Sequence, residues 1–298
     1  MTGQPYLNQA RERVATRCVC CDGGTLASSP AILMPFVAHR ALGYPPVRID
    51  ESWGLRTVQQ GMAYSICKSL LCRDCGHLFL DLRFSDREMS ALYDDYRGPA
   101  YTELRDSYEP GYREKNARLV AGAPYVAEVE AFLRPRLPAH PRVLDWGGDT
   151  GVNSPFVRER QCLDIFDISK APVVSGARQV DHAMIVASHY DLVVCSNVLE
   201  HVPYPYDVLL DLRQVMTPTT LLYLEVPCEE LMLGAEARDD VHLRKKHWHE
   251  HVNFFSHRSL AALARRAGLR LLDSRQAVVP SETSSNTVLM VACRLQDD

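Results

Sequence analysis

Residues 143–151 read Val-Leu-Asp-Trp-Gly-Gly-Asp-Thr-Gly, and this stretch decides the fold. An apolar strand ends in the acid Asp145, and a glycine-rich turn follows it. Glycines let the backbone approach a bound nucleoside closely, and a carboxylate at a strand tip can hold a cationic or hydroxyl group. The pattern predicts an α/β fold with a ligand site where this strand ends.

The flanking sequence alternates short apolar strands with helices, which is typical of a parallel sheet. We expect one helix over about 114–134, before Pro135, and another over Arg258–Ala267, with Gly268 just past its end. The expected strands are Arg142–Asp145, Leu163–Phe166, Leu192–Cys195 and Leu221–Val226, with a closing pair at about Arg270–Gln276 and Thr287–Cys293.

Two further motifs follow the glycine-rich turn in the chain. Residues 163–167, Leu-Asp-Ile-Phe-Asp, end a second strand in an acid, where nucleotide-binding α/β folds accept hydrogen bonds from ribose hydroxyls. Residues 190–203 read Tyr-Asp-Leu-Val-Val-Cys-Ser-Asn-Val-Leu-Glu-His-Val-Pro, and residues 222–227 read Leu-Tyr-Leu-Glu-Val-Pro. Because the carboxyl ends of parallel strands share one edge, these motifs should meet there.

With these motifs in this order, the sequence resembles the class I S-adenosylmethionine-dependent methyltransferases over roughly residues 115–295. The resemblance implies a Rossmann-like seven-stranded core, mostly parallel with the last strand antiparallel, and S-adenosylmethionine as the cofactor. It implies cofactor contacts from Asp145, Gly147, Gly148, Gly151, Asp167, Asn197 and Val198. Asp167 would bind the ribose, and Asn197 and Val198 would flank the methyl donor. Asp149 departs from the family, which usually has its middle glycine there, so its side chain would crowd the cofactor or add a carboxylate beside it.

Two Cys-x-x-Cys pairs precede this core, Cys18 with Cys21 and Cys72 with Cys75. In a cytosolic chain, clustered cysteines indicate metal rather than disulfides, and two such pairs complete a closed Cys₄ site typical of structural zinc. Cys20 could replace Cys18 as a ligand, and four unrelated buried thiols are the alternative to zinc. The insertion between the pairs, about residues 26–66, is rich in proline and aromatics and could form a wall over the substrate site.

We divide the chain into three parts on this basis. Residues 1–95 form a small zinc-binding module with its insertion, and residues 135–298 form the cofactor-binding core. Between them, residues 96–134 form a tyrosine-rich linker and a helix; the tyrosines either close a lid over a cleft or serve as packing residues.

Two histidine motifs supply candidate catalytic residues. Glu200-His201 follows the third core strand, and Glu250-His251 lies within residues 247–256, His-Trp-His-Glu-His-Val-Asn-Phe-Phe-Ser. A histidine near neutral pKa can take a proton from an acceptor, and a neighbouring glutamate can orient it. The alternatives are a packed, hydrogen-bonded histidine at either position, or a second metal held by His242, His247, His249 and His251.

The zinc pairs, the cofactor motifs and the Glu-His-Val-Asn-Phe-Phe-Ser segment together resemble the sugar C-methyltransferases of deoxysugar pathways. That resemblance implies His251 as the base, with Glu250 and His201 assisting, and a sugar, nucleotide sugar or glycan precursor as the acceptor. Those enzymes carry a C-terminal domain, which we expect to be absent here because the sequence ends at Asp298. A small-molecule O- or N-methyltransferase and an inactive zinc-stapled binding module are the rival functions.

Composition narrows the partners. The chain is 46% hydrophobic and 23% charged with a net charge of −4, and its basic residues are interspersed with acids, which disfavours nucleic acid. No signal peptide and no apolar run of membrane-spanning length is present, so we expect no membrane partner and a cytoplasmic location. A dinucleotide-dependent oxidoreductase shares the first acid and glycine turn but fits residues 197–203 less well.

Overall fold

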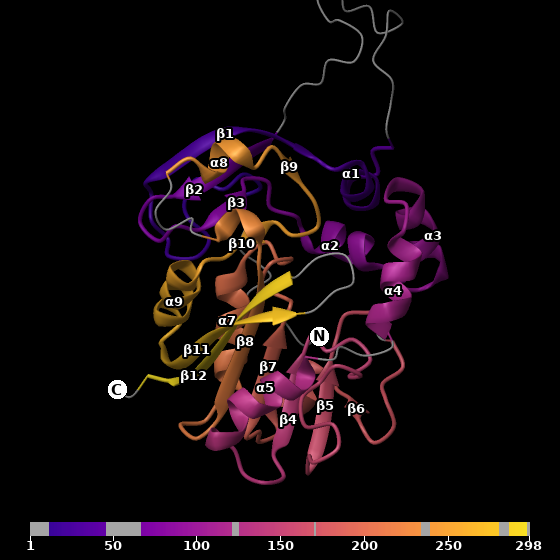
Figure 1. The fold of residues 1–298 in the computed structure, drawn as a ribbon, viewed down its shortest axis with the longest axis vertical. Coiled ribbons are helices and arrows are strands. Elements are labelled where there is room, and N and C mark those ends of the chain that lie inside the picture. Colours follow the sequence, from indigo (N-terminus) through magenta and orange to yellow (C-terminus); the bar gives the residue numbers. More distant parts are fainter. Residues whose placement is uncertain are drawn as a thin grey trace, which may run out of the picture.

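The computed structural model describes residues 12–45, 67–120, 125–169, 171–233, 239–279 and 286–296. Within them, a seven-stranded sheet forms the lower half of the view in Figure 1, and a five-stranded sheet lies above it. None of the helices in these segments is long and apolar enough to cross a membrane.

The seven-stranded sheet confirms the expected core. Its order is β11-β12-β8-β7-β4-β5-β6. The bounds are β4 Arg142–Trp146, β5 Cys162–Phe166, β6 Arg178–Gln179, β7 Leu192–Ser196, β8 Leu221–Cys228, β11 Leu269–Val279 and β12 Asn286–Leu295. Strands β6, β5, β4, β7 and β8 pair in parallel, whereas β12 is antiparallel to both β8 and β11. Only the two-residue strand β6 had no counterpart among the strands expected from the sequence.

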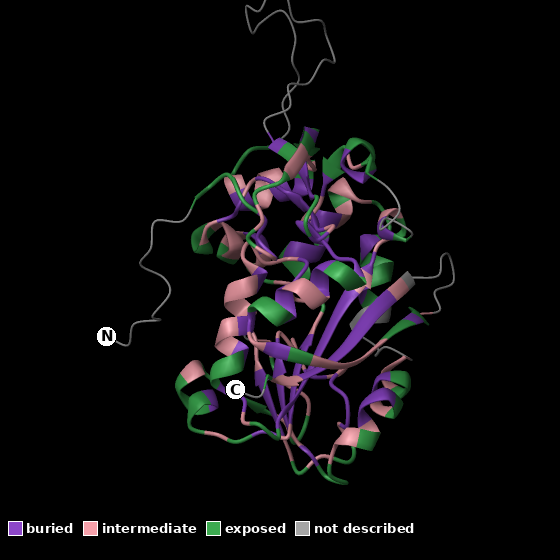
Figure 2. Ribbon diagram, turned by 90° about the vertical axis from the view of Figure 1, so that its left-hand side faces the viewer, coloured by how far each residue is buried: buried purple, intermediate pink, exposed green. Residues whose placement is uncertain are grey.

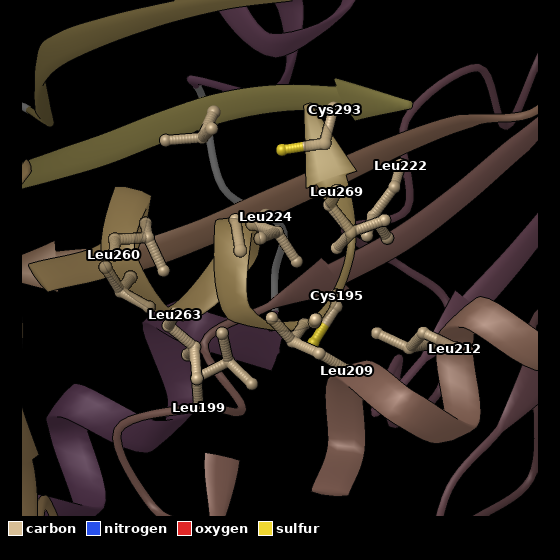
Figure 3. Packing of buried hydrophobic residues seen from close by; sticks show 14 of the residues in the cluster. Cys195, Leu199, Leu209, Leu212, Leu222, Leu224, Leu260, Leu263, Leu269 and Cys293 are labelled. Atoms are coloured by element: carbon tan, nitrogen blue, oxygen red, sulfur yellow. The ribbon is translucent and has the colours of Figure 1, made fainter. Parts of the chain in front are cut away.

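Helices cover both faces of this sheet because its strands are apolar on both sides. Leu222 and Leu224 of β8 belong to one core cluster, with α7 (Pro205–Gln214) and α9 (His257–Arg266), as Figure 3 shows for its leucines. Leu221 and Tyr223, which alternate with them, join α5 (Val126–Leu133) in another cluster. Strands β4, β5, β7, β8 and β12 are therefore buried along most of their length, whereas β6 and β11 at the two edges are more exposed (Figure 2).

The helix expected over 114–134 is two helices, so that expectation was wrong in part. Helix α4 spans Tyr112–Val120 and α5 spans Val126–Leu133, followed by a 3₁₀ turn at Arg134–Arg136. The sequence between them contains Gly122 and Pro124, which disfavour a continuous helix. Helix α9 ends as expected before Gly268, whose φ of 71° is in the left-handed region.

The five-stranded sheet is built from two distant parts of the chain. Its order is β10-β3-β2-β1-β9, with β1 Leu26–Leu33, β2 Cys67–Cys72, β3 Leu78–Leu80, β9 His247–Trp248 and β10 Asn253–Phe254. Both edge strands thus come from residues 247–254, which we call the returning segment because the chain returns there to the N-terminal sheet. Trp248 is fully buried and packs against Phe254 in the cluster that contains Phe36 and Leu78. The apolar side chains of the returning segment complete this small core, so the N-terminal sheet is not confined to residues 1–95.

Most of the remaining helices lie around the five-stranded sheet and between the two sheets (Figure 1). They are α1 Pro35–Leu42, α2 Asp86–Tyr93, α3 Pro99–Tyr108, α8 Val241–Arg244 and a 3₁₀ turn at Glu230–Met232. Helix α6, His182–Val186, instead packs against the seven-stranded sheet through Ile185. The side chain of Ser85 accepts a hydrogen bond from the backbone N–H of Glu88, and the side chain of Glu88 accepts one from the backbone N–H of Ser85. This capping box fixes where α2 begins. Of the proline-rich insertion, residues 26–45 form β1 and α1, while Pro46 and Trp53 lie outside the described residues.

Candidate active site

A cavity of about 1180 Å³ opens at the carboxyl ends of β4, β5, β7 and β8. This is the edge at which open α/β sheets bind ligands. Its walls come from the loops after these strands, from α2 to α4, and from the returning segment with Glu250 and His251. The described residues 26–45 contribute nothing to its lining, so that part of the insertion does not form the expected wall.

The glycine-rich turn lines one end of the cavity through Gly147 and Gly148. Gly147 has a φ of 81°, and a Cβ there would lie 2.4 Å from Cγ2 of Val198. The turn therefore forms a hollow that any side chain at position 147 would fill, and we call this hollow the glycine cradle. It fits the close approach of a nucleoside cofactor. Gly151 does not line the cavity; a Cβ there would meet Cδ1 of Ile165 at 3.0 Å, so close packing beneath the turn requires glycine at this position, and its cofactor contact stays a prediction.

The two strand-end acids lie where the sequence placed them. Asp145 is buried, accepts a hydrogen bond from the hydroxyl of Ser154, and has its pKa raised to about 7 by burial. Asp167 accepts hydrogen bonds from the backbone N–H groups of Asp149 at 2.8 Å and Ser169 at 2.7 Å. Both acids line the cavity, and their carboxylates are held in place by neighbouring donors.

Asp149 has a left-handed backbone conformation, which glycine also adopts readily. Its φ is 52°, a left-handed value that aspartate tolerates better than most residues. Its carboxylate pairs with Arg97, from Nη1 to Oδ2 at 3.1 Å. The side chain therefore links the glycine-rich turn to the segment before α3, and it still lines the cavity.

Asn197 and Val198 follow β7 beside this turn, and both line the cavity. Asn197 has a φ of 53° and donates from Nδ2 to Oε1 of Glu225 at 2.9 Å. Glu225 also accepts from Tyr125 at 2.6 Å and from Ser196 at 2.7 Å. Tyr125 and Glu225 also line the cavity and were not expected from the sequence. A glutamate within the apolar run of β8 could have indicated that Glu225 belongs to a site.

His201 and His251 meet although fifty positions separate them in the sequence. Their ring centroids are 4.6 Å apart with the planes nearly perpendicular. The hydroxyl of Tyr93 lies 2.7 Å from Nδ1 of His201, and Oε1 of Glu229 lies 2.9 Å from Nδ1 of His251. Potential ligand atoms of Glu200, His201 and His251 all lie within 4.8 Å of one another. The histidine cluster, as we call Glu200, His201 and His251, thus faces the cavity.

Glu250 is placed differently from the expectation that it would orient His251. Its Oε2 accepts from Nη1 of Arg105 at 2.8 Å and from the hydroxyl of Tyr101 at 3.2 Å. Glu229, which the sequence reading did not select, is the carboxylate that bonds to His251. The reason is tertiary: the chain turns after β8 and brings Glu229 to the returning segment.

Burial and neighbouring charges separate the pKa values of this group. Burial lowers the pKa of His201 to about 3 and raises that of Glu200 to about 8. Burial favours neutral Glu250, but Arg105 together with His201, His251 and His249 outweighs it and lowers the pKa of Glu250 to about 2. Burial also opposes a charged His251, yet the hydrogen bond that its ring donates to Glu229 and the nearby carboxylates raise its pKa. His251 is therefore the histidine of the pair that can hold a proton near neutral pH.

The four histidines considered for a second metal do not converge. His249 bonds to Glu109 at 2.6 Å and His251 bonds to Glu229, while His242 is buried and His247 is exposed on β9. This alternative from the sequence is wrong for the described residues.

The four expected zinc ligands do come together. The Sγ atoms of Cys18 and Cys75, and those of Cys21 and Cys72, are 3.6 Å apart, and all four lie within 4.8 Å of one another. A tetrahedral site with Zn–S bonds of about 2.3 Å needs sulfurs roughly 3.8 Å apart, whereas a disulfide needs about 2.05 Å. Cys20 is buried outside this group, so Cys18 is the member of the cluster.

The sheet order, the antiparallel β12 and the glycine cradle beside two strand-end acids define the class of this protein: it is an S-adenosylmethionine-dependent methyltransferase. The sequence profile of the methyltransferase domain family matches residues 112–274, more than half of the chain, and the chain belongs to that family. A comparison with curated proteins found no match.

Solved structures share the fold at low sequence identity. The 1,6-didemethyltoxoflavin-N1-methyltransferase of Burkholderia thailandensis, with bound 1,6-didemethyltoxoflavin and S-adenosylhomocysteine, has a TM-score of 0.50 and 15% identity. The match covers 79% of this chain and 98% of that one. An S-adenosylmethionine-dependent methyltransferase of Methanosarcina mazei has a TM-score of 0.40 and 15% identity, over 56% of this chain and 98% of that one.

Proposed function

We propose that the chain methylates a small-molecule acceptor whose transferable proton is taken by His251. The observation that carries this proposal is the histidine cluster on the wall of the same cavity that the glycine cradle lines. A base is useful at that place because the attacking atom of an alcohol, amine or acidic carbon must lose a proton. A sugar or glycan precursor is the acceptor that the resemblance of the sequence favours.

We assign the cofactor to the glycine-rich end of the cavity. Gly147 and Gly148 would give room for its backbone contacts, Asp145 would face its amino-acid end, Asp167 would bind the ribose hydroxyls, and Asn197 and Val198 would flank its sulfur. S-adenosylmethionine, when bound, supplies an electrophilic methyl group on a sulfonium. The chain's own contribution is then to align the acceptor and to remove its proton.

We call the part of the cavity formed by Tyr93, Glu200, His201, Glu229, Glu250 and His251 the acceptor wall. Its histidines and two of its glutamates have distinct proposed roles. His251 takes the proton at the nitrogen opposite Nδ1, and Glu229 stabilises the resulting imidazolium through Nδ1. His201, held by Tyr93, packs against the ring of His251 and fixes its orientation. Glu250 holds Arg105 and α3 against the returning segment, which makes it a positioning residue.

We also propose a structural zinc ion on Cys18, Cys21, Cys72 and Cys75. The sulfur separations support it, and so does the closed set of four thiols without an acid or histidine among them. The zinc would join the segment before β1 to the turn between β2 and β3, and thereby stabilise the five-stranded sheet that carries Glu250 and His251 between its edge strands.

The test is a methyl-transfer assay with labelled donor and a panel of sugars, nucleotide sugars, phenols and amines. With the best acceptor, His251→Ala should lower turnover by ~10²-fold or more while the affinity for S-adenosylhomocysteine stays near that of the wild type. His247→Ala, which removes an exposed histidine of the same segment, is the matched control. Unchanged turnover in His251→Ala would refute the base, and no cofactor binding by the wild type would refute the proposed function itself.

A further inference from the structure

The cavity wall holds many more acids than bases. Its described lining contains eight carboxylates and three cationic side chains. The carboxylates are Asp145, Asp149, Asp167, Glu200, Glu225, Glu229, Glu230 and Glu250, and the cations are Arg97, Arg105 and Lys115. Arg97 pairs with Asp149 at 3.1 Å and Arg105 pairs with Glu250 at 2.8 Å. Two of the three cations are therefore already neutralised by carboxylates of the same wall.

The carboxylates divide between the two ends of the cavity. Asp145, Asp149 and Asp167 surround the glycine-rich turn, where the proposed cofactor brings a sulfonium and an ammonium of its own. Glu200 and Glu229 lie instead at the acceptor end, beside His201 and His251. The positive charge of the cofactor accounts for the first group, so the second group calls for a separate explanation.

Glu200 is the member of the acceptor wall that lacks a partner. Its residue is 1% exposed, and among the described residues its Oε2 has no hydrogen-bond donor. Its Oε1 lies 3.7 Å from Nε2 of His201, beyond hydrogen-bond range. The backbone is firmly fixed, because the carbonyl of Glu200 accepts from the N–H groups of Val252 at 2.8 Å and Asn253 at 3.1 Å. Buried carboxylates are normally satisfied, so an orphaned oxygen on a cavity wall indicates a donor supplied by a ligand.

The same charges argue against an anionic acceptor or an anionic intermediate. A phosphate group would be placed among glutamates, and a proton abstracted from carbon would leave an enolate there with Lys115 as the one remaining cation of the described lining, against Glu200 and Glu229. A positive charge that moves onto the acceptor is stabilised by the same carboxylates. The electrostatics of this wall thus favour a cationic acceptor over a phosphorylated sugar or a carbon nucleophile.

We propose that the acceptor is an aliphatic amine that enters as an ammonium ion and is held by Glu200 beside His251. This inference rests on the proposed function and names its substrate class. Burial raises the pKa of Glu200 to about 8, and an ammonium ion beside it lowers that pKa again and keeps the carboxylate ionised. The orphaned oxygen of Glu200 then accepts an N–H of the ammonium, and Glu229 keeps His251 oriented toward the same nitrogen.

The step balances with the groups at hand. One N–H proton of the ammonium moves to His251, which frees the nitrogen lone pair. That lone pair forms the new nitrogen–carbon bond to the methyl group while the carbon–sulfur bond breaks and its electron pair stays on sulfur. The positive charge of the sulfonium passes to the methylated nitrogen, where Glu200 stabilises it, and His251 returns its proton to water after product release.

The experiment measures acceptor binding to the full chain saturated with S-adenosylhomocysteine, by calorimetry. The probes are matched pairs of amine and alcohol: benzylamine with benzyl alcohol, cyclohexylamine with cyclohexanol, and D-glucosamine with D-glucose, with D-glucose 1-phosphate as the anion. At least one amine should bind ~10-fold or more tightly than its alcohol, and Glu200→Gln should remove that preference, because hydrogen bonds between charged groups are the stronger ones. The matched control is Glu103→Gln, the same change at an exposed residue of α3 outside the cavity. It should leave the preference for the amine unchanged.

Three results of this experiment would overturn the inference, and a fourth would come from adding Zn²⁺. They are the absence of any amine that exceeds its alcohol twin, tighter binding of the phosphate, and an amine preference that survives Glu200→Gln. Stoichiometric Zn²⁺ binding at Glu200, His201 and His251 that excludes the amines would overturn it as well, since it would give the orphaned oxygen another partner. Binding of S-adenosylhomocysteine is recorded first, so a failure of the proposed function is seen separately from a failure of the amine preference.

Discussion

The two ends of the cavity are built in different ways. The cofactor end consists of strand tips and the turns that directly follow them, chiefly residues 145–149, 167 and 197–198, so it is local to consecutive units of one sheet. The acceptor end joins Tyr93, Glu200 with His201, Glu229, and Glu250 with His251, which come from four separate segments and two sheets. A site that is local to one sheet follows from sequence spacing, whereas a site between two sheets depends on how they pack.

The largest effect should come from closing the cofactor end. In Gly147→Ala, the new Cβ would lie 2.4 Å from Val198 and the φ of 81° would be strained, so the affinity for S-adenosylhomocysteine should fall ~10²-fold or more. Gly43→Ala is the matched control: its φ of 71° is equally left-handed, but nothing lies within 4 Å of its Cβ. Calorimetry compares the two, and equal affinities would show that the turn does not contact the cofactor.

Removing the proposed zinc should damage the acceptor end and spare the cofactor end. Cys72→Ser should abolish one equivalent of bound zinc, measured by elemental analysis, and lower Tm by on the order of 10 °C. Turnover should fall more than the affinity for S-adenosylhomocysteine, because Glu250 and His251 connect the edge strands of the five-stranded sheet. Cys162→Ser, at a half-exposed cysteine of β5, is the control. A wild-type protein free of metal would contradict the zinc site.

A change in the pH profile should follow from separating Glu229 and His251. Turnover should rise with pH through the pKa of His251, since only the neutral imidazole accepts a proton. The hydrogen bond from His251 to the carboxylate of Glu229 raises that pKa against the opposing effect of burial. Glu229→Gln should therefore move the acid limb of kcat to lower pH, while Glu103→Gln should not. An acid limb that stays in place would show that another group controls it.

The smallest effect should come from Asp149→Gly. The backbone already has a φ of 52°, which glycine adopts readily, and the side chain is directed to Arg97 rather than packed in the sheet. We expect the affinity for S-adenosylhomocysteine to change by less than ~10-fold. A much larger loss would show that the carboxylate contacts the cofactor, and a large gain would show that it crowds the cofactor site.

The sequence predicted most of the fold because the strands carry their own signals. Apolar runs predicted six of the seven core strands, β4, β5, β7, β8, β11 and β12, and the family resemblance implied the antiparallel last strand. The exception, β6, has two exposed residues and no apolar run. The single helix expected over 114–134 was wrong in part because it ran through Gly122 and Pro124, which lie in the sequence between α4 and α5.

The candidate site was predicted unevenly for a related reason. Asp145, Gly147, Asp167 and Asn197 line the cavity because each directly follows or ends a strand of one sheet. Glu229 was missed, and Glu250 was given its role, since adjacency in sequence favoured the neighbour of His251. Only the packing of the loop after β8 against the returning segment shows which carboxylate bonds to the histidine.

The sequence by itself therefore determined the class of protein and the four clustered cysteines, and it predicted the residues of the proposed cofactor end of the cavity. Their signals are local: a strand, a turn and a pair of thiols within a few residues each. The tertiary structure alone decided that residues 247–254 complete the N-terminal sheet, that His201 meets His251, and that Oε2 of Glu200 finds no donor within the described parts of the chain. Those contacts arise where the two sheets pack together, and packing between distant segments leaves no periodic pattern in the chain.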